Sequence, residues 1–144
     1  MRSLAPITLA VLTLALGSAP GSAQEARQYI NGRSASQATG APFSGAVLVG
    51  NTLYLSGVLG GGATAEEAAR TAMNSIKTAV EAAGMTMDDL VQVQIFAADL
   101  ADYAAFNTVY RSYFTREFPA RAFLGAGSLL NNARFEVLGI AVKR

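Results

Sequence analysis

Apolar residues along the chain follow two periods, one typical of strands and one typical of helices. Val91-Gln92-Val93-Gln94-Ile95 alternates strictly between apolar and polar residues, which predicts a strand with one buried face. Gly50-Asn51 separates two β-rich runs, and this dipeptide is typical of a tight hairpin turn. The predicted strands cover residues 46–49, 52–56, 91–95, 121–124 and 134–142, with a short edge strand near Tyr29 and Ile30.

Two segments have the apolar spacing of amphipathic helices. The first opens at Thr64, where Glu67 completes a capping box, and Gly84 predicts its end. The second is expected to begin with Asp102 as its N-cap and to end before Pro119, because proline disfavours the helical conformation of the preceding residue. Its apolar side carries Tyr103, Phe106, Val109, Tyr110, Tyr113 and Phe114.

The order of these elements is ββ-α-β-α-ββ, which predicts an α+β domain with a single mixed sheet. Right-handed crossovers would place both helices on the same face of that sheet. The other face still carries apolar residues, so we expect further copies of the chain to cover it in a symmetric oligomer. Residues 57–62 are rich in glycine and predict a loop, but no Lys-Ser or Lys-Thr pair follows to make it a phosphate-binding loop.

The first residues differ in character from the rest of the chain. Arg2 is followed by an apolar run from Leu4 to Leu16 and then by small residues up to Ala23. A basic start, a short apolar run and a small-residue exit are typical of a secretory signal peptide, and this run is too short to span a membrane. We therefore expect cleavage after Ala23, leaving residues 24–144 as one domain in the periplasm or outside the cell.

The composition excludes several chemistries. The chain has 144 residues, 51% of them hydrophobic, and it contains no Cys and no His, so it cannot build a Ser-His-Asp triad, a thiolate nucleophile or an ordinary zinc site. The formal net charge of +1 argues against a nucleic-acid-binding surface, which needs a basic stripe. Four aspartates could ligate a metal, but capping and turn roles explain them better and we expect no metal site: Asp88, Asp89, Asp99 and Asp102.

Three polar residues lie among apolar neighbours, where an unpaired charge is costly. Glu136 and Arg121 each lie in an apolar strand, and Asn107 shares a helical stripe with Tyr110. One interpretation is structural: Arg121 and Glu136 form a salt bridge, and Asn107 hydrogen-bonds a loop. The other interpretation is that these residues form a site.

The motif Pro119-Ala120-Arg121 is followed, in a later apolar strand, by Glu136 and the ending Ala141-Val142-Lys143-Arg144. In this arrangement the chain resembles the reactive intermediate deaminase (Rid, YjgF) family from about Ala41 to Arg144. The supporting segments occur in the same order: Pro42-Phe43-Ser44-Gly45-Ala46-Val47, Gly50-Asn51-Thr52-Leu53-Tyr54-Leu55-Ser56-Gly57, Ala82-Ala83-Gly84, and Phe96 to Asp99 leading to Asn107 and Tyr110.

This resemblance implies a chorismate-mutase-like α+β fold assembled as a homotrimer, with sites between subunits. Enzymes of the family hydrolyse reactive imines and enamines, such as 2-aminoacrylate in its 2-iminopropionate form, to 2-oxo acids and ammonia. No cofactor is expected, because an imine carbon is already electrophilic and hydrolysis needs only positioning and a proton acceptor. The implied partner is a small 2-imino acid, with no nucleic acid and, once the leader is removed, no membrane.

The resemblance also assigns roles to individual residues. Arg121 would bind the α-carboxylate of the substrate through its planar fork of donors. Glu136 would hold, or partly deprotonate, the attacking water, and both side chains would face a shared cleft. Five further residues are expected at the ligand: Ser56, the backbone of Gly57, the backbone carbonyl of Phe123, Asn107 and Phe43.

The chain departs from the family at three places. Phe43 and Phe123 stand where members often have Tyr and Cys, and Leu129-Leu130 replaces a common Leu-Pro pair. Phe43 removes a hydroxyl from the ligand's surroundings, so the alternative function is a non-catalytic, carboxylate-binding or chaperone-like trimer. Ribonuclease activity, which is associated with some relatives, is a third possibility that the near-neutral charge disfavours.

Overall fold

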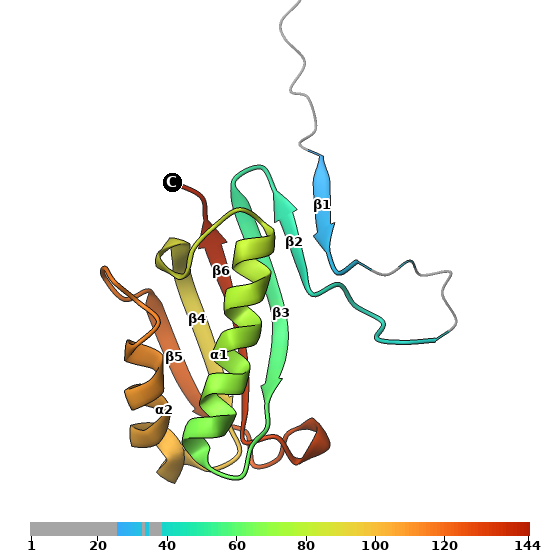
Figure 1. Ribbon diagram of the computed structural model, residues 1–144. Helices are drawn as coiled ribbons and strands as arrows, with labels where there is room; N and C mark the ends of the chain where they lie inside the picture. The colour runs from blue at the N-terminus through green and yellow to red at the C-terminus, as the bar shows by residue number, and fades with distance from the viewer. Residues whose placement is uncertain (1–25, 33, 35–38) are drawn as a thin grey trace, which may run out of the picture.

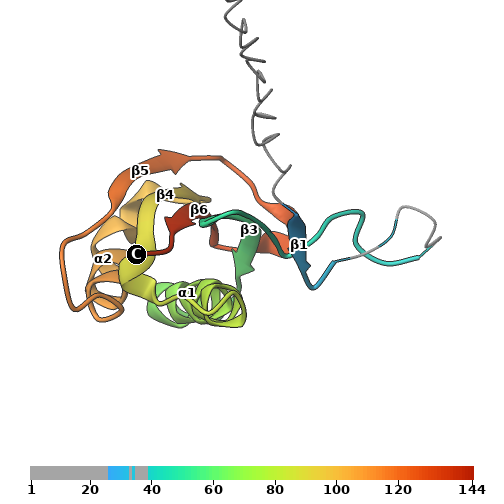
Figure 2. The same cartoon turned by 90° about the horizontal axis from the view of Figure 1, so that it is seen from above.

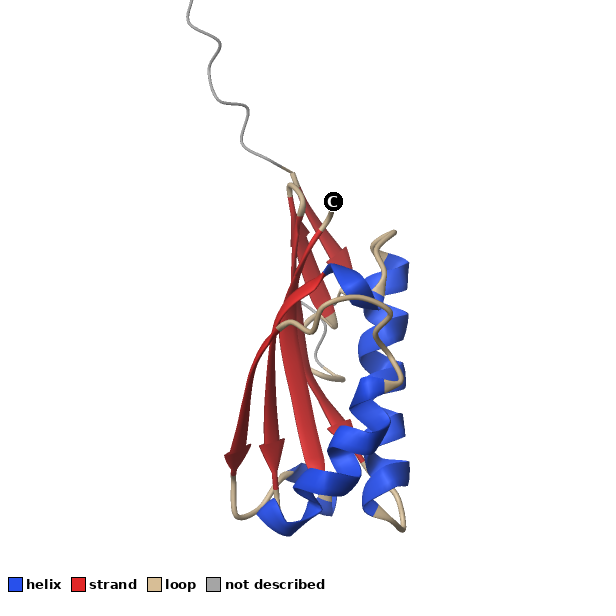
Figure 3. Cartoon of the chain, turned by 90° about the vertical axis from the view of Figure 1, so that its left-hand side faces the viewer, coloured by secondary structure: helices blue, strands red, loops and turns tan. Residues whose placement is uncertain are grey.

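The computed structural model describes residues 26–32, 34 and 39–144, so the predicted leader, residues 1–23, lies outside the described residues. One mixed sheet contains six strands in the order β1-β2-β3-β6-β4-β5, and two α-helices lie on one face of it (Figures 1 and 3). This arrangement confirms the predicted α+β architecture. The elements are β1 (Arg27–Ile30), β2 (Ala46–Val49), β3 (Thr52–Gly60), α1 (Ala65–Ala82), β4 (Leu90–Ala97), α2 (Tyr103–Arg111), β5 (Ala120–Gly125) and β6 (Phe135–Val142), with short 3-10 turns at Met87–Asp89, Leu100–Asp102 and Leu130–Asn132.

The N-terminal hairpin follows the predicted pattern. Gly50 has a φ of 58° in the turn between β2 and β3, and Val49 pairs with Thr52 across that turn. Glycine adopts this left-handed conformation without a steric penalty, which is why it suits the turn. The edge strand predicted near Tyr29 and Ile30 is β1, which pairs antiparallel with β2.

β3 is longer than predicted. The loop expected over residues 57–62 is wrong for residues 57–60, because the strand continues to Gly60 and pairs there with β6. Pairing with a central strand outweighs the low strand propensity of glycine. A side chain at Gly60 would overlap the carbonyl of Ala68 in α1, so glycine lets this strand approach the helix closely.

α1 has both of its predicted ends. The Glu67 N–H donates to the Thr64 hydroxyl at 3.2 Å, and the Thr64 N–H donates to the Glu67 carboxylate at 3.3 Å. At the other end, Gly84 has a φ of 69° and its N–H donates to the Glu81 carbonyl at 2.9 Å. These bonds satisfy backbone groups that a helix terminus leaves unpaired.

α2 is shorter than predicted. It ends at Arg111, whereas the apolar pattern continues to Phe114. Tyr113 and Phe114 lie beyond the helix and still pack against the core. The periodicity therefore overestimates the helix, because aromatic residues in the following turn are partly buried without helical geometry.

Asp89 and Asp99 stabilise short turns, as predicted, whereas Asp102 does not act as the predicted helix cap. The Asp89 carboxylate accepts from the Thr86 N–H at 2.7 Å, and the Asp99 carboxylate accepts a backbone N–H at 2.8 Å in the turn before α2. Asp102, the predicted cap of α2, makes no capping bond and instead pairs with Arg134 at 2.9 Å. Among the described residues, no three His, Cys, Asp or Glu side chains cluster as metal ligands would.

The hydrophobic core lies between the sheet and the two helices. Phe106, Phe135 and Met73 are fully buried there. Both helices cover the same side of the sheet (Figure 2), which leaves the opposite side, called here the open face, uncovered within the described chain; Tyr54 on that face is 51% exposed. No helix in the described part of the chain is long and apolar enough to cross a membrane.

Candidate functional site

Arg121 and Glu136 point to opposite faces of the sheet. β4 lies between their strands, and along it Arg121 pairs with Val93 whereas Glu136 pairs with Phe96. Paired residues share a face and successive residues of a strand alternate between faces. Val93 is only 1% exposed beneath the helices, so Arg121 lies on the helix side and Glu136 on the open face.

This geometry corrects two expectations about the pair. Arg121 and Glu136 do not form a salt bridge, since no such contact occurs among the described residues. They also do not face a shared cleft within one chain. The predicted site residues instead fall into a helix-side group of Arg121, Asn107 and Phe123, and an open-face group of Glu136, Gly57 and Ser56 with Phe43 beside it.

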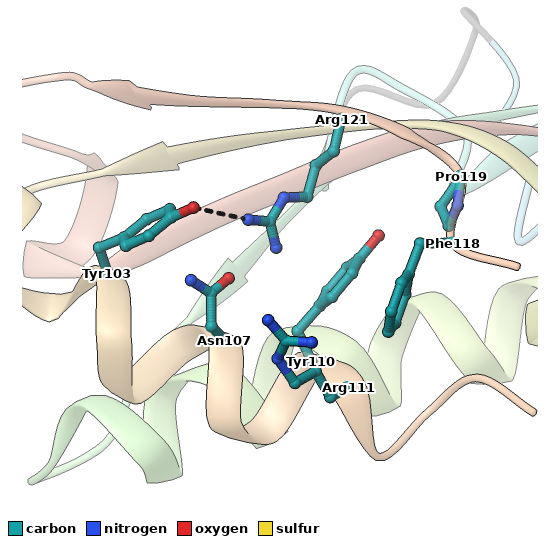
Figure 4. A pocket seen from close by; sticks show the side chains of 7 residues that line it. All are labelled: Tyr103, Asn107, Tyr110, Arg111, Phe118, Pro119 and Arg121. Atoms are coloured by element: carbon teal, nitrogen blue, oxygen red, sulfur yellow. Dashed lines mark hydrogen bonds between the residues drawn. The ribbon is translucent and has the colours of Figure 1, made fainter.

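The helix-side group lies at a pocket of about 230 Å³ between α2 and the start of β5 (Figure 4). Four residues of α2 recur at spacings of three and four, so their side chains leave the same face of the helix. The segment before β5 forms one end of the pocket (Figure 4). The lining residues are Tyr103, Asn107, Tyr110, Arg111, Phe118, Pro119 and Arg121.

Aromatic rings hold the Arg121 guanidinium in this pocket. Its central carbon lies 4.7 Å from the ring centre of Tyr110 and 5.8 Å from that of Tyr103, and one of its NH₂ groups donates to the Tyr103 hydroxyl at 3.4 Å. Cation–π contacts of this kind are strongest where water is excluded. No carboxylate of the described chain lies within salt-bridge distance of Arg121, so its remaining donors are available to an anionic ligand.

The pKa values of the two tyrosines in the pocket, Tyr103 and Tyr110, shift in opposite directions. A hydrogen bond with Asn107, and then the positive charge of Arg121, lower the pKa of Tyr103. Burial raises the pKa of Tyr110 to about 12, so this hydroxyl stays protonated at neutral pH. It is buried without a hydrogen-bond partner among the described residues, and it points into the pocket (Figure 4). Tyr110 is therefore a donor in need of an acceptor.

Phe123 follows Arg121 in β5 by two positions but does not line the pocket. Its ring packs edge-to-face against Tyr103 and Phe106, with ring centres 5.0 Å and 5.5 Å apart. The ring thus belongs to the aromatic core and is not among the lining residues of the pocket. The aromatic side chain at this position therefore leaves the pocket open.

The open-face group is built on a β-bulge. The register of β3 against β6 shifts between Leu55 and Val58, so Ser56 and Gly57 together stand opposite one residue of β6. A side chain at Gly57 would overlap the Glu136 carboxylate. Glycine at the bulge therefore provides the space that this carboxylate occupies.

Ser56 ties a neighbouring segment to the bulge. Its hydroxyl donates to the Ser44 carbonyl at 2.6 Å, and its N–H donates to the Gly45 carbonyl at 3.0 Å. These bonds hold the segment before β2 beside the bulge, and Phe43 at its start is 56% exposed. Glu136 is half-buried and has no ion-pair partner in the described ranges, so its carboxylate can accept hydrogen bonds from a water.

Sequence reasoning assigns Arg121 and Asn107 to the site and misses the other five lining residues of the pocket. Among these five, Tyr110 is predicted on the apolar side of its helix, and Arg111 is not singled out at all. The signal was present in the helix itself, because both residues follow Asn107 at the spacing of one helical face. When one residue of a helix is expected at a site, the residues three and four positions away on the same face are further candidates.

Comparison with known proteins assigns the chain to a family. The family described as Endoribonuclease L-PSP matches residues 33–143. A protein of Dermatophagoides farinae named 2-iminobutanoate/2-iminopropanoate deaminase is 40% identical over 109 residues, which is 70% of this chain and 85% of that protein. The human protein of the same name is 34% identical over 111 residues, covering 71% of this chain and 80% of the relative.

A solved structure shares both the fold and the sequence pattern. The crystal structure of the YjgF gene product of Escherichia coli superimposes with a TM-score of 0.70 and 32% identity, covering 74% of this chain and 92% of that one. The family match spans the segments that carry the helix-side and open-face groups. The chain therefore belongs to the reactive intermediate deaminase family, the family of YjgF and of the proteins described as Endoribonuclease L-PSP.

Proposed function

We propose that the protein hydrolyses 2-imino acids to 2-oxo acids and ammonia, at a site completed between two copies of the chain. The observation that carries this proposal is the Arg121 guanidinium, which is held in a pocket with no carboxylate partner in the described chain. The names of the relatives from Dermatophagoides farinae and from humans support the reaction class.

Arg121 suits the task of orienting the substrate. A planar guanidinium can donate two parallel hydrogen bonds to one carboxylate, which fixes the direction of the adjoining carbon. Tyr103 and Tyr110 restrict the guanidinium itself. A 2-imino acid bound through its carboxylate therefore presents its imine carbon in a defined direction, and positioning of this kind lowers the barrier to attack.

Glu136 suits the task of water activation. In the proposed reaction its carboxylate accepts a proton from water as the water oxygen bonds to the imine carbon, and that proton passes to the imine nitrogen. The resulting intermediate carries a hydroxyl and an amino group on one carbon. The hydroxyl proton then moves to nitrogen, the C–N bond breaks, and ammonia leaves together with a 2-oxo acid. No cofactor enters this sequence of steps.

Two copies are needed because the two groups lie on opposite faces of the sheet. The Glu136 carboxylate of one copy would meet the Arg121 pocket of a neighbour when the open face of one copy packs against the edge strand β5 of the next. Apolar residues on that face support such packing: Tyr54 lies between Val47 and Ile140 in one row across the strands. The assembly we propose is the symmetric homotrimer implied by the family resemblance.

The proposed compartment is the periplasm or the exterior of the cell. Its support is the signal-peptide pattern of residues 1–23. Fractionation of cells that express the full chain, followed by N-terminal sequencing, tests it. A product that starts at Gln24 in the exported fraction supports export, and an uncleaved chain in the cytoplasm contradicts it.

A second candidate function is a trimer that binds small carboxylates without turnover. It is favoured by Phe43, an exposed ring with no hydroxyl in the segment that Ser56 holds beside the bulge. An endoribonuclease, the activity in the family's description, is disfavoured by the net charge of +1.

A direct assay separates these functions. An amino-acid oxidase generates the imine of alanine in situ, and semicarbazide traps whatever imine remains. The wild-type protein should lower the semicarbazone yield, whereas Arg121→Ala and Glu136→Ala should not, while circular dichroism shows that both variants keep the fold. Wild-type protein that behaves like buffer across several amino acids would favour the binding function instead.

A further inference from the structure

The Arg121 pocket contains a second arginine and no acid. Arg111 leaves the same face of α2 as Asn107, and its guanidinium carbon lies 5.8 Å from the ring centre of Phe118. Figure 4 shows Arg111 reaching the pocket from α2 and Arg121 reaching it from β5. None of the lining residues is acidic, and in the described chain neither arginine has an ion-pair partner.

Two positive groups at one small pocket favour a ligand with more than one negative charge. Like charges repel each other, and an anion between them replaces that repulsion with attraction. Arg111 itself lines the pocket, so its positive charge adds to that of Arg121 there. A ligand with a single carboxylate on Arg121 would leave Arg111 without a counter-charge.

A buried donor gives an independent indication of a ligand at the same place. The Tyr110 hydroxyl is one position away from Arg111 along α2, is buried, and has no acceptor among the residues the structure describes. Buried polar groups are almost always hydrogen-bonded, so an unpaired one pointing into a pocket calls for an acceptor from outside the chain. A carboxylate oxygen provides that acceptor.

The size of the pocket limits what the ligand can be. A volume of about 230 Å³ corresponds to roughly seven or eight water molecules at about 30 Å³ each. This space accepts a short aliphatic chain that ends in a carboxylate.

We propose that the preferred substrates are 2-imino dicarboxylic acids, whose side-chain carboxylate binds Arg111 and accepts a hydrogen bond from Tyr110 while Arg121 binds the α-carboxylate. The reaction itself rests on the proposed function. The preference for two carboxylates is a binding property and can be tested without turnover.

The 2-oxo acids that the proposed reaction produces are stable, so they can be used to test the preference for two carboxylates. Isothermal titration calorimetry on the full assembly compares 2-oxoglutarate, which has two carboxylates, with 2-oxobutanoate, which has one. We expect the wild-type protein to bind 2-oxoglutarate at least about tenfold more tightly, as one charge-assisted contact predicts. Arg111→Gln should abolish this difference, and it should weaken binding of 2-oxobutanoate much less than binding of 2-oxoglutarate.

A matched variant controls for net charge. Arg70→Gln removes the same charge from an exposed position of α1 outside the pocket, and the preference should persist in it. Tyr110→Phe should weaken binding of 2-oxoglutarate by roughly threefold to tenfold, through the loss of one donor to a charged group. Equal affinity of the wild-type protein for both acids, or an equal loss for both acids in Arg111→Gln, would overturn the proposal.

Measuring imine hydrolysis distinguishes a failure of the dicarboxylate preference from a failure of the proposed deaminase function. The oxidase assay is run with glutamate and with alanine as the sources of imine. Selective, Arg111-dependent binding of the diacid without hydrolysis of either imine overturns the proposed function and leaves the binding preference intact. Hydrolysis of both imines at equal rates in the wild-type protein and in Arg111→Gln overturns the preference alone.

Discussion

The two sides of the sheet carry the two halves of one predicted site, and they differ in how complete they are. On the helix side, Arg121 lies among aromatic rings in a pocket of about 230 Å³. On the open face, Glu136 lies over Gly57 at a bulge, half-buried and without an ion-pair partner in the described chain.

This difference assigns substrate binding to one side of the sheet and catalysis to the other. The helix-side pocket already has its donors in place, so we infer that a single chain can bind a carboxylate. The open-face carboxylate does not line that pocket, so in the proposed mechanism it acts on a substrate bound by a neighbouring copy. Changes on one side should therefore affect binding, and changes on the other side should affect turnover.

Glu136→Gln should have the largest effect. Removing the proton acceptor should lower kcat by at least about 100-fold, which is the usual contribution of general base catalysis. The affinity for 2-oxobutanoate should stay within about twofold, because the helix-side pocket is unchanged. The oxidase-coupled assay measures kcat, and calorimetry measures the affinity. An equal loss of affinity would contradict the assignment of binding to the helix side and of catalysis to the open face.

Arg121→Lys should show the opposite behaviour. Lysine cannot form the two parallel bonds of a guanidinium, so the affinity for 2-oxobutanoate should fall by roughly tenfold to 100-fold, or about 1.5–3 kcal/mol. At saturating substrate, kcat should fall much less than in Glu136→Gln. A variant with normal affinity would show that the carboxylate binds elsewhere.

Gly57→Ala should have an intermediate effect, confined to the open face. The added methyl group overlaps the Glu136 carboxylate, so the carboxylate must move and kcat should fall by about tenfold, with a loss of about 1–3 kcal/mol in stability. Gly61→Ala is the matched control, since a Cβ there meets nothing within 4 Å. Equal effects of the two substitutions on kcat would argue against the bulge as a positioning element.

Tyr110→Phe should have the smallest effect, and it should stabilise the unliganded protein. Removing a buried unpaired hydroxyl should raise the free energy of unfolding by up to about 1 kcal/mol. Because burial raises the pKa of Tyr110 from 10.0 to about 12 in the folded state, the unfolded chain releases this proton first and wild-type stability declines as the pH rises from 10 to 12. Urea titrations over that range should show a shallower decline in the variant, and identical slopes would contradict the assignment.

Local patterns predicted the elements well, because their signals lie within a few residues of each other. The capping box of Thr64 and Glu67 and the Gly50 turn occur as expected. The errors have non-local causes. Residues 57–60 continue β3 because β6 pairs with them, and no local feature of a glycine-rich segment shows that a partner strand is present.

Individual candidate residues of the site could be named from the sequence, but not their arrangement. Sequence identifies Arg121 and Glu136 as charges in apolar strands, but a shift of one residue in register moves a side chain to the other face of a sheet. Only the pairing of Arg121 with Val93 and of Glu136 with Phe96 shows that the two lie on opposite sides.

Complementation between two inactive variants tests the central claim most directly. Arg121→Ala and Glu136→Gln are co-expressed with different tags, and trimers that carry both tags are purified. If the site joins Arg121 of one copy to Glu136 of another, trimers that carry both tags should regain about one third of wild-type deaminase activity, because one of their three interfaces then holds both intact residues. Mixed trimers as inactive as either variant alone would contradict the account.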